Sequence, residues 1–496
     1  MKKATKLTAT KEKLGKLPTI EIVEKKKVIF VGSEAAPFIA TGGLADVLGS
    51  LPKAIASNGN YDVSVILPMY SNIKNEYREK FEFITNFNVS VGWRSQYAGI
   101  FTTEYQGVKF FFIDNEYYFK REGNIYGFYD DGERFAFFSR AVLDTVARLN
   151  IYPDVMHFND WQSAGSVIYL KGMYYGDENF KKVKSIFTIH NIEYQGTFPM
   201  ETFTDLFGFQ ENLRGVVEFN GALNLMKGAI ELSDIVSTVS PTYAEEIKHS
   251  FYAHGLENII KRNEGKLRGI LNGIDEDYYN PKTDKFLFAN YSYRGLKGKA
   301  ICKKELQKLV NLPVREDVPI IALITRLVSH KGLDLVKCVI EELLHKDVQV
   351  VILGKGERGY EEFFTDLAKK YSGKCATIIA FNQDLSRKIY SGADLFLMPS
   401  KSEPCGLSQM IASRYGTVPI VRETGGLNDS IKQFNGVNGN GFTFHNYNAH
   451  DMLHSICEGV ELYKDKEKWK QLQKIVMTTD FSWKVQSKKY EDLYNN

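Results

Sequence analysis

The chain has 496 residues, more than one hydrophobic core usually organises, so two or more domains are expected. Hydrophobic residues make up 44% and charged residues 25%, as in an ordinary globular protein. The formal net charge of +3 and the scattered lysines do not indicate a nucleic-acid-binding surface. No apolar run approaches the roughly 18 residues that span a membrane. Neither a nucleic acid nor a membrane is therefore expected as a partner.

The cysteines are odd in number, with no C-x-x-C pair: Cys302, Cys338, Cys375, Cys405 and Cys457. This pattern indicates neither a disulfide framework nor a structural zinc site. It fits a reducing compartment, and we expect a cytoplasmic protein.

Residues 1–26 are rich in Lys and Thr and lack the apolar centre of a signal peptide. They also contain more acidic residues than a transit peptide does. We interpret them as a flexible basic tail.

From Val28 onward, short β-branched or aromatic runs alternate with segments of helical periodicity. Residues 28–31 and 62–67 have the pattern of strands, with apolar residues at helical spacing between them, which predicts a βαβ unit. Further strands are expected at 108–113, 154–158, 184–190 and 234–239, and a helix over 133–149. The alternation predicts a parallel sheet covered on both faces.

Near residues 271–275 the alternation of strand and helix patterns ends, and a polar, aromatic stretch follows. We interpret this stretch as a crossover between domains. A second series of strands is expected at 318–325, 348–353, 376–381, 393–398 and 418–421. The sequence therefore predicts an α/β protein with two doubly wound, Rossmann-like lobes, residues 27–268 and 269–480. Ligands of such sheets bind beyond the carboxyl ends of the strands, so the site is expected between the lobes.

Two cations follow the first strand of the second series. Arg326 comes directly after that strand, and Lys331 lies where the next helix is expected to open. A guanidinium binds phosphate oxygens in a bidentate way, an ammonium acts as a point charge, and a helix N-terminus adds partial positive charge. The pair would neutralise a departing nucleoside diphosphate without a metal, or it is a surface pair that favours solubility.

An acidic residue, Glu403, lies in the run 399–407 (PSKSEPCGL), between an apolar strand and an expected helix. Its carboxylate would bind sugar hydroxyls or stabilise positive charge developing at an anomeric carbon. Gly406 would let backbone N–H groups approach a ligand closely. Alternatively, Glu403 is a helix N-terminal residue favoured by the helix dipole, and Cys405 is a small buried residue.

In the first lobe, HFNDW (157–161) ends one predicted strand and His190-Asn191 ends the next. Both lie at one sheet edge, so Asp160 and His190 are candidates for chemistry, although a structural histidine is an equally open interpretation. The tetrapeptide Thr-Gly-Gly-Leu occurs at 41–44 and again at 424–427, each time between a strand and a helix. Each copy would place backbone N–H groups at a helix N-terminus.

Two strings point to other functions. Residues 354–359 form a literal G-x-G-x-x-G, as in dinucleotide-binding dehydrogenases, but this run follows the second strand of its lobe and lacks the usual acidic partner. Residues 275–277 match the D-x-D of metal-dependent glycosyltransferases of another fold, without a third ligand nearby. No metal site is predicted.

Eight segments in chain order resemble the family of bacterial glycogen synthases and plant starch synthases, which has the two-lobed GT-B fold. They are SEAAPF…TGGLADV (33–47), HFNDW (157–161), FTIHNIEYQG (187–196), TVSPTYAEEI (238–247), LNGID (271–275), TRLVSHKGLDL (325–335), PSKSEPCGL (399–407) and RETGGL (422–427). FSW at 481–483 resembles the family's closing helix, so residues 481–496 are expected to cross back onto the first lobe.

The resemblance implies transfer of glucose from ADP-glucose to the non-reducing end of an α-1,4-glucan (glycogen, starch or a maltooligosaccharide), with retention and without a metal or other cofactor. It implies that Arg326 and Lys331 neutralise the diphosphate, Glu403 and Cys405–Leu407 hold the glucose, and Thr424–Gly426 cradle phosphate. The other implied residues are His190 and Asp160 as catalytic, Gly42, Gly43, Asp46, Asn272, Phe381, Cys405, Gly406, Leu407, Thr424, Gly425 and Gly426 as donor-binding, and Trp161 and Asn191 as acceptor-binding.

One position departs from the family pattern, because Ala40 stands where the family has the Lys of Lys-Thr-Gly-Gly-Leu. Loss of that ammonium predicts a lower donor affinity. It leaves the choice between ADP-glucose and UDP-glucose open, with ADP-glucose favoured. It also motivates an alternative function, a glucan-binding or regulatory protein that kept the fold and lost turnover.

Overall fold

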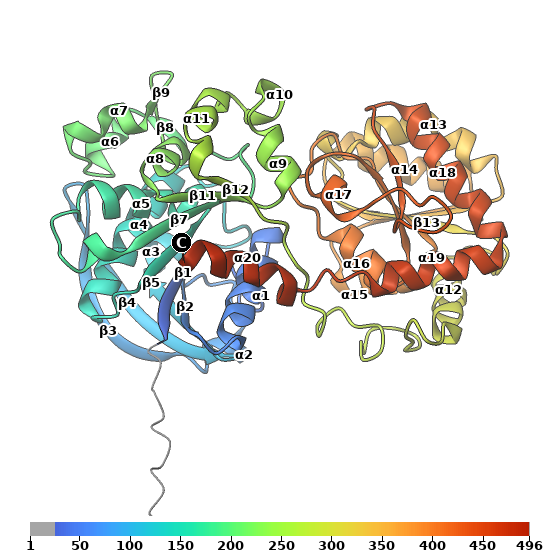
Figure 1. The fold of residues 1–496 in the computed structure, drawn as a ribbon, viewed down its shortest axis with the longest axis horizontal. Helices are drawn as coiled ribbons and strands as arrows, with labels where there is room; N and C mark the ends of the chain where they lie inside the picture. The colour runs from blue at the N-terminus through green and yellow to red at the C-terminus, as the bar shows by residue number, and fades with distance from the viewer. Residues whose placement is uncertain (1–24, 496) are drawn as a thin grey trace, which may run out of the picture.

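A computed structural model describes residues 25–495, and its first strand already begins at Lys26, inside the segment predicted to be tail. Residues 1–24 of that predicted tail lie outside the described residues. The chain forms two lobes side by side (Figure 1), each with a mainly parallel sheet and helices packed on it. The predicted α/β fold with two doubly wound lobes is confirmed.

Within residues 25–495, the first lobe is built on a nine-stranded sheet of order β12-β11-β7-β6-β1-β2-β5-β4-β3. Its parallel strands are β1 (Lys26–Val31), β2 (Tyr61–Pro68), β5 (Val108–Asp114), β6 (Val155–Asn159), β7 (Lys184–Ile189), β11 (Ile235–Thr238) and β12 (Leu267–Gly269). The main helices are α1 (Gly43–Ser57), α4 (Asp131–Arg148), α5 (Trp161–Gly172), α8 (Leu225–Leu232) and α9 (Pro241–Glu246). Shorter helices are α2 (Asn75–Arg78), α3 (Glu116–Phe119), α6 (Thr202–Asp205), α7 (Arg214–Val217), α10 (Ser250–Ala253) and α11 (Glu257–Arg262).

An antiparallel hairpin, which the sequence analysis did not predict, extends this sheet at one edge. It consists of β3 (Glu82–Val91) and β4 (Arg94–Tyr105). Phe87 and Val89 face inward and are buried, whereas Asn86, Asn88 and Ser90 alternate with them and are exposed. This period of two is the sequence signal of a half-covered strand. A second antiparallel layer, β8 (Thr197–Pro199), β10 (Ala222–Asn224) and β9 (Glu218–Phe219), follows β7.

In the second lobe, the described chain forms a six-stranded parallel sheet of order β15-β14-β13-β16-β17-β18. The strands are β13 (Ile320–Ile324), β14 (Gln349–Gly354), β15 (Cys375–Ile379), β16 (Leu395–Met398), β17 (Val418–Arg422) and β18 (Phe442–Phe444), of which only β18 was not predicted. Its helices are α12 (Lys297–Leu309), α13 (Leu333–Leu344), α14 (Arg358–Lys370), α15 (Gln383–Gly392), α16 (Ser408–Arg414), α17 (Gly425–Ser430), α18 (Ala449–Lys464) and α19 (Lys466–Thr478). Over residues 25–495, none of the helices combines the length and apolar character needed to cross a bilayer.

The chain crosses between the lobes twice, and the two crossings touch. The backbone N–H of Ile274 donates to the carbonyl of Phe481 at 2.9 Å, and a Cβ on Gly273 would lie only 2.7 Å from the backbone nitrogen of Trp483. Helix α20 (Trp483–Asn495) then returns to the first lobe and packs beside α1 (Figure 1).

We expect Tyr494→Ala to destabilise the first lobe by about 3–5 kcal/mol, the usual cost of truncating a buried aromatic side chain. The Tyr494 ring is buried against Phe30 and Tyr61, and its hydroxyl is 3.0 Å from Nδ1 of His157. Tyr494→Phe should cost only about 1 kcal/mol, since it removes just the hydroxyl contact. Urea unfolding measures both. A loss for Tyr494→Ala no larger than that for the exposed control Tyr175→Ala would contradict the docking of α20.

Candidate active site

A largely buried ion pair lies beyond the carboxyl ends of β13 and β16. Nζ of Lys331 donates to Oε2 of Glu403 at 2.7 Å, and the Ser400 hydroxyl donates to the same oxygen at 2.9 Å. Burial alone would raise the pKa of Glu403, but Lys331, Ser400 and the neighbouring His330 hold that pKa below its usual value. Glu403 is therefore ionised, with one of its oxygens already engaged by a cation.

The sequence predicted that Lys331 lies in the first turn of a helix, but the structure places it elsewhere. It ends the 3-10 turn Ser329–Lys331, and α13 begins two residues later, after Gly332 with φ +72°. A Cβ on Gly332 would overlap the carbonyl of Pro399, so this turn packs directly on the segment that carries Glu403. The left-handed glycine and this close approach bring Lys331 to Glu403.

Arg326 lies two residues beyond the end of β13 and is exposed. Among the side chains that the structure describes, it has no hydrogen-bond or ion-pair partner, which leaves its guanidinium free for a ligand. Arg326 and Lys331 act on the same neighbour: burial and these two cations lower the pKa of His330, whereas Glu403 and Glu193 of the first lobe oppose that shift. The two predicted cations therefore share one location, close to the first lobe.

The second Thr-Gly-Gly-Leu segment, residues 424–427, packs closely against the backbone of Glu403 and Cys405. A Cβ on Gly425 would overlap the carbonyl of Glu403, and one on Gly426 would overlap the carbonyl of Cys405. The hydroxyl of Thr424 and the N–H of Gly425 donate to Oε1 of Glu246, at 2.8 and 3.1 Å. The predicted phosphate cradle thus holds a carboxylate of the first lobe, which a phosphate at this place would have to displace.

Helix α9 supplies further contacts between the lobes that sequence reasoning missed. The Ser240 hydroxyl donates to the carbonyl of Pro404 at 2.7 Å. The backbone N–H and hydroxyl of Thr242 donate to the two carboxylate oxygens of Asp429, at 2.8 and 2.7 Å. The TVSPTYAEEI segment had been noted only for its resemblance; its run of hydroxyl and carboxylate side chains was the available signal for a polar interface.

Two pairs of predicted donor-binding residues meet at the same junction. A Cβ on Gly43 would lie 4.0 Å from Cδ1 of Leu407, so the first-lobe glycine loop touches the second lobe directly. Burial raises the pKa of the Cys405 thiol to about 12, an effect that outweighs the lowering of this pKa by Asn272. A thiol with so high a pKa is not a nucleophile near neutrality. In the same segment, Gly406 adopts φ +69°, a conformation that favours glycine.

The first-lobe glycine loop is held by Glu34, which the sequence analysis assigned no role. The Glu34 carboxylate accepts from the N–H of Thr41 at 2.5 Å and from its hydroxyl at 2.8 Å. Burial raises the pKa of Glu34, and burial together with Glu34 raises the pKa of Asp46 to about 7. Glu34 lies shortly after β1, just as His190 lies shortly after β7. This position after a buried strand was the available sequence signal for Glu34. Ala40 is exposed beside this loop.

His190, Asp160 and Asn191 are joined by direct contacts. Oδ1 of Asp160 accepts from the backbone N–H of His190 at 2.7 Å and from that of Asn191 at 3.4 Å, and Asp160 has φ +56°. Nε2 of His190 is 2.9 Å from Oδ1 of Asn159. Burial lowers the pKa of His190 to about 3 and raises that of Asp160 to about 7. The imidazole is therefore neutral near pH 7. A non-glycine residue at positive φ is a strained position of the kind that clusters at functional sites.

Two predicted aromatic residues lie at the outer parts of the site. Trp161 packs between Phe135 and Phe198, with ring centroids 5.0 and 5.8 Å away, and Gly196 lies against its ring. Phe381 follows β15 and is 79% exposed, so its ring is open to stacking on a planar group.

The predicted donor-binding residue Gly42 lies near Glu34. A Cβ added to Gly42 would be 4.0 Å from Oε1 of Glu34.

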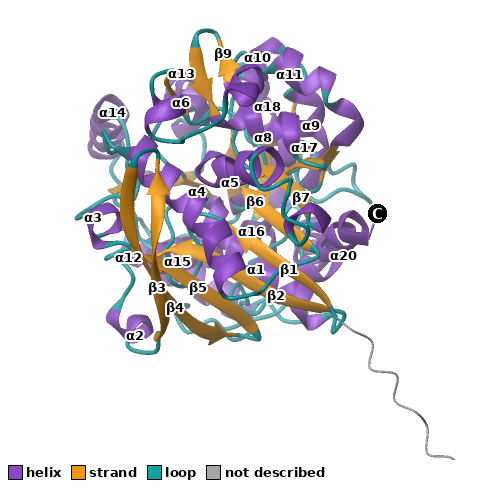
Figure 2. Ribbon diagram, turned by 90° about the vertical axis from the view of Figure 1, so that its left-hand side faces the viewer, coloured by secondary structure: helices purple, strands orange, loops and turns teal. Residues whose placement is uncertain are grey.

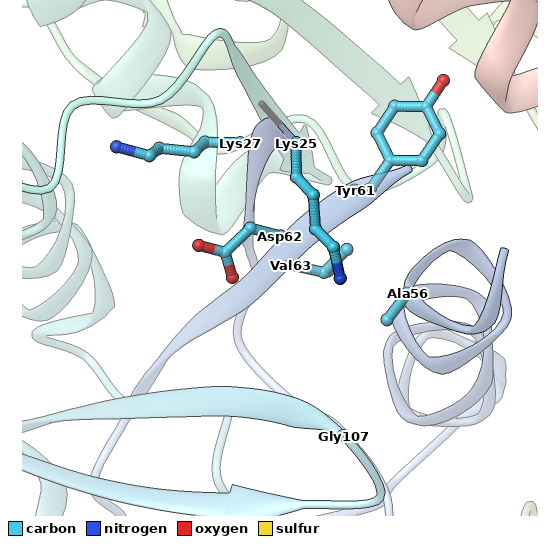
Figure 3. A pocket seen from close by; sticks show the side chains of 7 residues that line it. All are labelled: Lys25, Lys27, Ala56, Tyr61, Asp62, Val63 and Gly107. Carbon is cyan, nitrogen blue, oxygen red and sulfur yellow. The ribbon is translucent and has the colours of Figure 1, made fainter. Parts of the chain in front are cut away.

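Other candidate regions show no such convergence. The depression in Figure 3, lined by Lys25, Lys27, Tyr61 and Asp62 among others, lies at the amino ends of β1 and β2, the edge opposite to where ligands of parallel sheets bind. Two glycines of the 354–359 string serve packing, since a Cβ on Gly354 would overlap the carbonyl of Thr325 and one on Gly356 that of Leu327.

The two aspartates of the D-x-D string form ion pairs with a lysine of the first lobe. Asp275 and Asp277 both pair with Lys53, at 3.5 and 3.7 Å. Across residues 25–495 no group of three His, Cys, Asp or Glu side chains is placed to hold a metal ion.

Two Rossmann-like lobes, with a carboxylate and two cations where they meet, define a glycosyltransferase of the two-lobed class. Comparison with known proteins agrees: residues 27–262 match the starch synthase catalytic domain, and residues 307–474 match glycosyl transferases group 1. The chain is 48% identical to a glycogen synthase of Alkaliphilus metalliredigens, covering 95% of this chain and 99% of that one. It is 46% identical to a glycogen synthase of Anoxybacillus flavithermus, covering 95% and 97%.

Two solved structures resemble the whole chain. The catalytic domain of starch synthase IV from Arabidopsis thaliana, bound to ADP and acarbose, superposes with a TM-score of 0.88 at 34% identity, covering 95% of this chain and 99% of that one. Sucrose-phosphate synthase from Thermosynechococcus elongatus shares the fold, with a TM-score of 0.60 at 14% identity, covering 95% and 98%. The chain belongs to the glycogen and starch synthase family, and it is a glycosyltransferase. The dehydrogenase interpretation of the glycine string was wrong.

Asp46→Asn should flatten the pH dependence of stability. Between about pH 4 and 7 the folded protein keeps a proton on Asp46 that the unfolded chain has released, so the free energy of unfolding falls as pH rises through this window. The variant lacks this proton and should lose less stability between pH 5 and 8 than the wild type. Urea unfolding at four pH values measures the difference. An equal flattening by Asp62→Asn, at an exposed carboxylate, would show that the effect is not local to Asp46.

Proposed function

We propose that this enzyme transfers glucose from ADP-glucose to the non-reducing end of an α-1,4-glucan, with retention of configuration and without a metal ion. The observation that carries this proposal is the contact between Lys331 and Glu403 beside the unpaired Arg326. One carboxylate that accepts hydroxyl hydrogens and two cations that bind phosphate oxygens are the groups that a sugar diphosphate requires.

In the proposed reaction the bond between C1 of glucose and the diphosphate oxygen breaks, and a bond forms between C1 and O4 of the acceptor. The diphosphate leaves as an anion, and the acceptor hydroxyl loses its proton. Arg326 and Lys331 stabilise the charge that grows on the leaving group, which is where preorganised cations contribute most to rate. The neutral His190 and the strained Asp160 would meet this region from the first lobe.

Three observations support the choice of donor and acceptor. The starch synthase IV domain was solved with ADP bound, and 34% identity over nearly the whole chain favours the same nucleotide here. The exposed ring of Phe381 would stack on the base. Trp161, which packs on Phe198, would supply an aromatic surface for the acceptor.

Incorporation of radiolabelled glucose into a glycogen primer tests the proposal directly. ADP-glucose should support transfer at a higher kcat/KM than UDP-glucose, and excess EDTA should leave the rate unchanged. Folded protein that transfers glucose from neither donor would instead favour the alternative of a glucan-binding protein. A rate abolished by EDTA and restored by a divalent cation would contradict the metal-free diphosphate site.

Lys331→Ala and Glu403→Ala should each lower kcat by at least about 100-fold, the scale seen when preorganised transition-state electrostatics are lost. Lys346→Ala, at an exposed lysine of the same lobe, is the matched control and should be neutral. Initial rates at saturating donor and primer provide the measurement. A Lys331 or Glu403 variant with near-normal kcat would remove that residue from the catalytic machinery.

Ala40→Lys should lower the KM for ADP-glucose several-fold, because it adds an ammonium to the exposed glycine loop that touches Leu407. A phosphate-directed charge–charge contact at such a site is worth about 1 kcal/mol, or roughly fivefold. Ala40→Met controls for side-chain length without charge. If the Lys and Met variants have the same KM, position 40 does not reach the donor.

A further inference from the structure

A buried asparagine, Asn159, lies against the imidazole of His190, and the sequence analysis assigned it no role. It is the last residue of β6, which lies between β7 and β1 in the first-lobe sheet (Figure 2), and it is 1% exposed. His190 directly follows β7, and Val31 ends β1. Asn159 therefore lies where the carboxyl ends of three neighbouring strands meet, the edge at which ligands of parallel sheets bind.

Backbone carbonyls fix the orientation of the Asn159 amide. Its Nδ2 donates to the carbonyl of Val31 at 3.1 Å and to that of His157 at 3.0 Å. A carboxamide has two N–H hydrogens, and these two bonds use both. Turning the amide over would lose both bonds and place Oδ1 against two carbonyl oxygens. Oδ1 therefore faces His190, and it lies 2.9 Å from Nε2 of that ring.

The Asn159 oxygen determines which nitrogen of His190 carries the hydrogen. Burial lowers the pKa of His190 to about 3, so near pH 7 the ring is neutral, with one N–H donor and one acceptor nitrogen. A carboxamide oxygen can only accept a hydrogen bond, so the hydrogen lies on Nε2. Nδ1 is then the acceptor. No group within residues 25–495 donates a hydrogen bond to it, and His190 is only partly buried.

The main chain around His190 is held by other residues. Oδ1 of Asp160 accepts from the His190 N–H at 2.7 Å, and the Ile192 N–H donates to the hydroxyl of Tyr243 at 3.2 Å. With the backbone fixed, the imidazole can still rotate about its bond to Cβ. A half-turn would present a C–H to Asn159 in place of Nε2–H and lose this hydrogen bond. The orientation of the ring and its tautomer therefore depend on the same contact.

An acceptor nitrogen at this place suits the ligand of the proposed reaction. Sugar hydroxyls donate hydrogen bonds, and a neutral nitrogen of low basicity accepts such a bond without removing the proton. We propose that Asn159 is a positioning residue: it holds His190 with the hydrogen on Nε2, so that Nδ1 accepts a hydrogen bond from a hydroxyl of the sugar. The identity of the ligand rests on the proposed function, whereas the state of the ring does not.

Nuclear magnetic resonance of the wild type measures the state of the ring. Long-range nitrogen–hydrogen correlation spectra of protein made with isotope-labelled histidine distinguish the two tautomers, and His190→Ala identifies the signals of His190 among those of nine histidines. At pH 7 we expect the hydrogen on Nε2 and none on Nδ1. In Asn159→Ala the Nε2–H should exchange with water at least about fivefold faster, because the bond that protects it is lost. A hydrogen on Nδ1 in the wild type would overturn the proposal.

A double-mutant cycle tests whether Asn159 acts through His190. Asn159→Ala and His190→Ala should each lower kcat/KM for ADP-glucose at least about fivefold, the effect of one lost hydrogen bond. Because the two substitutions remove the same contact with the sugar, the double variant should lie within about twofold of His190→Ala. The proposal fails if the two effects multiply, or if folded Asn159→Ala has near-normal kcat/KM.

Asn115→Ala is the matched control. Asn115 is another buried asparagine of the first lobe; its amide donates to the carbonyl of Tyr97 at 2.7 Å and accepts from the N–H of Tyr118 at 3.1 Å. Its removal should lower the free energy of unfolding in urea about as much as Asn159→Ala does, with kcat/KM unchanged. Equal losses of kcat/KM in both variants would reduce the effect to general destabilisation and overturn the proposal. Absence of transfer by the wild type would instead count against the proposed function, because the spectra need no turnover.

Discussion

Glu403 carries a negative charge at a largely buried position, and the way that charge is accommodated organises the site. Withdrawing a carboxylate from water costs several kcal/mol unless it is paired and hydrogen-bonded. Lys331 and Ser400 supply the pairing, and Lys331 reaches Glu403 only because Gly332 adopts a left-handed conformation against Pro399. A donor that binds here meets a carboxylate with one oxygen engaged and a cation already in place, so little reorganisation is needed.

The same segment joins the two lobes. The glycines at 425 and 426 pack on the carbonyls of Glu403 and Cys405, while Ser240 of the first lobe donates to Pro404 between them. The Glu246 carboxylate accepts hydrogen bonds from the Thr424 hydroxyl and the Gly425 N–H. Burial raises the pKa of this carboxyl group. Residues of both lobes that we propose bind the donor therefore sit within one packed junction, and relative movement of the lobes would change the proposed donor site directly.

Much of this arrangement could be predicted from the sequence, for identifiable reasons. Buried parallel strands leave continuous apolar runs, and the residues shortly after them fall at the carboxyl-end edge of their sheet, as Asp160 and His190 do in the first lobe and Arg326 does in the second. Other features left weaker traces. The β3–β4 hairpin shows a period of two within a series dominated by parallel strands, and the partners of Glu34 and Glu246 include backbone N–H groups, which no sequence pattern displays. The G-x-G-x-x-G string misled because glycine also permits close packing, here on Leu327.

We propose that Arg326 and Lys331 together hold the diphosphate at the junction of the lobes. Calorimetric titration of ADP into the wild type and Arg326→Ala, in buffer with EDTA, tests it most directly, because Arg326 is exposed and its removal should leave the fold intact. The account predicts at least about tenfold weaker binding by the variant, with Lys346→Ala unchanged. Equal ADP affinity in Arg326→Ala and the wild type would contradict it.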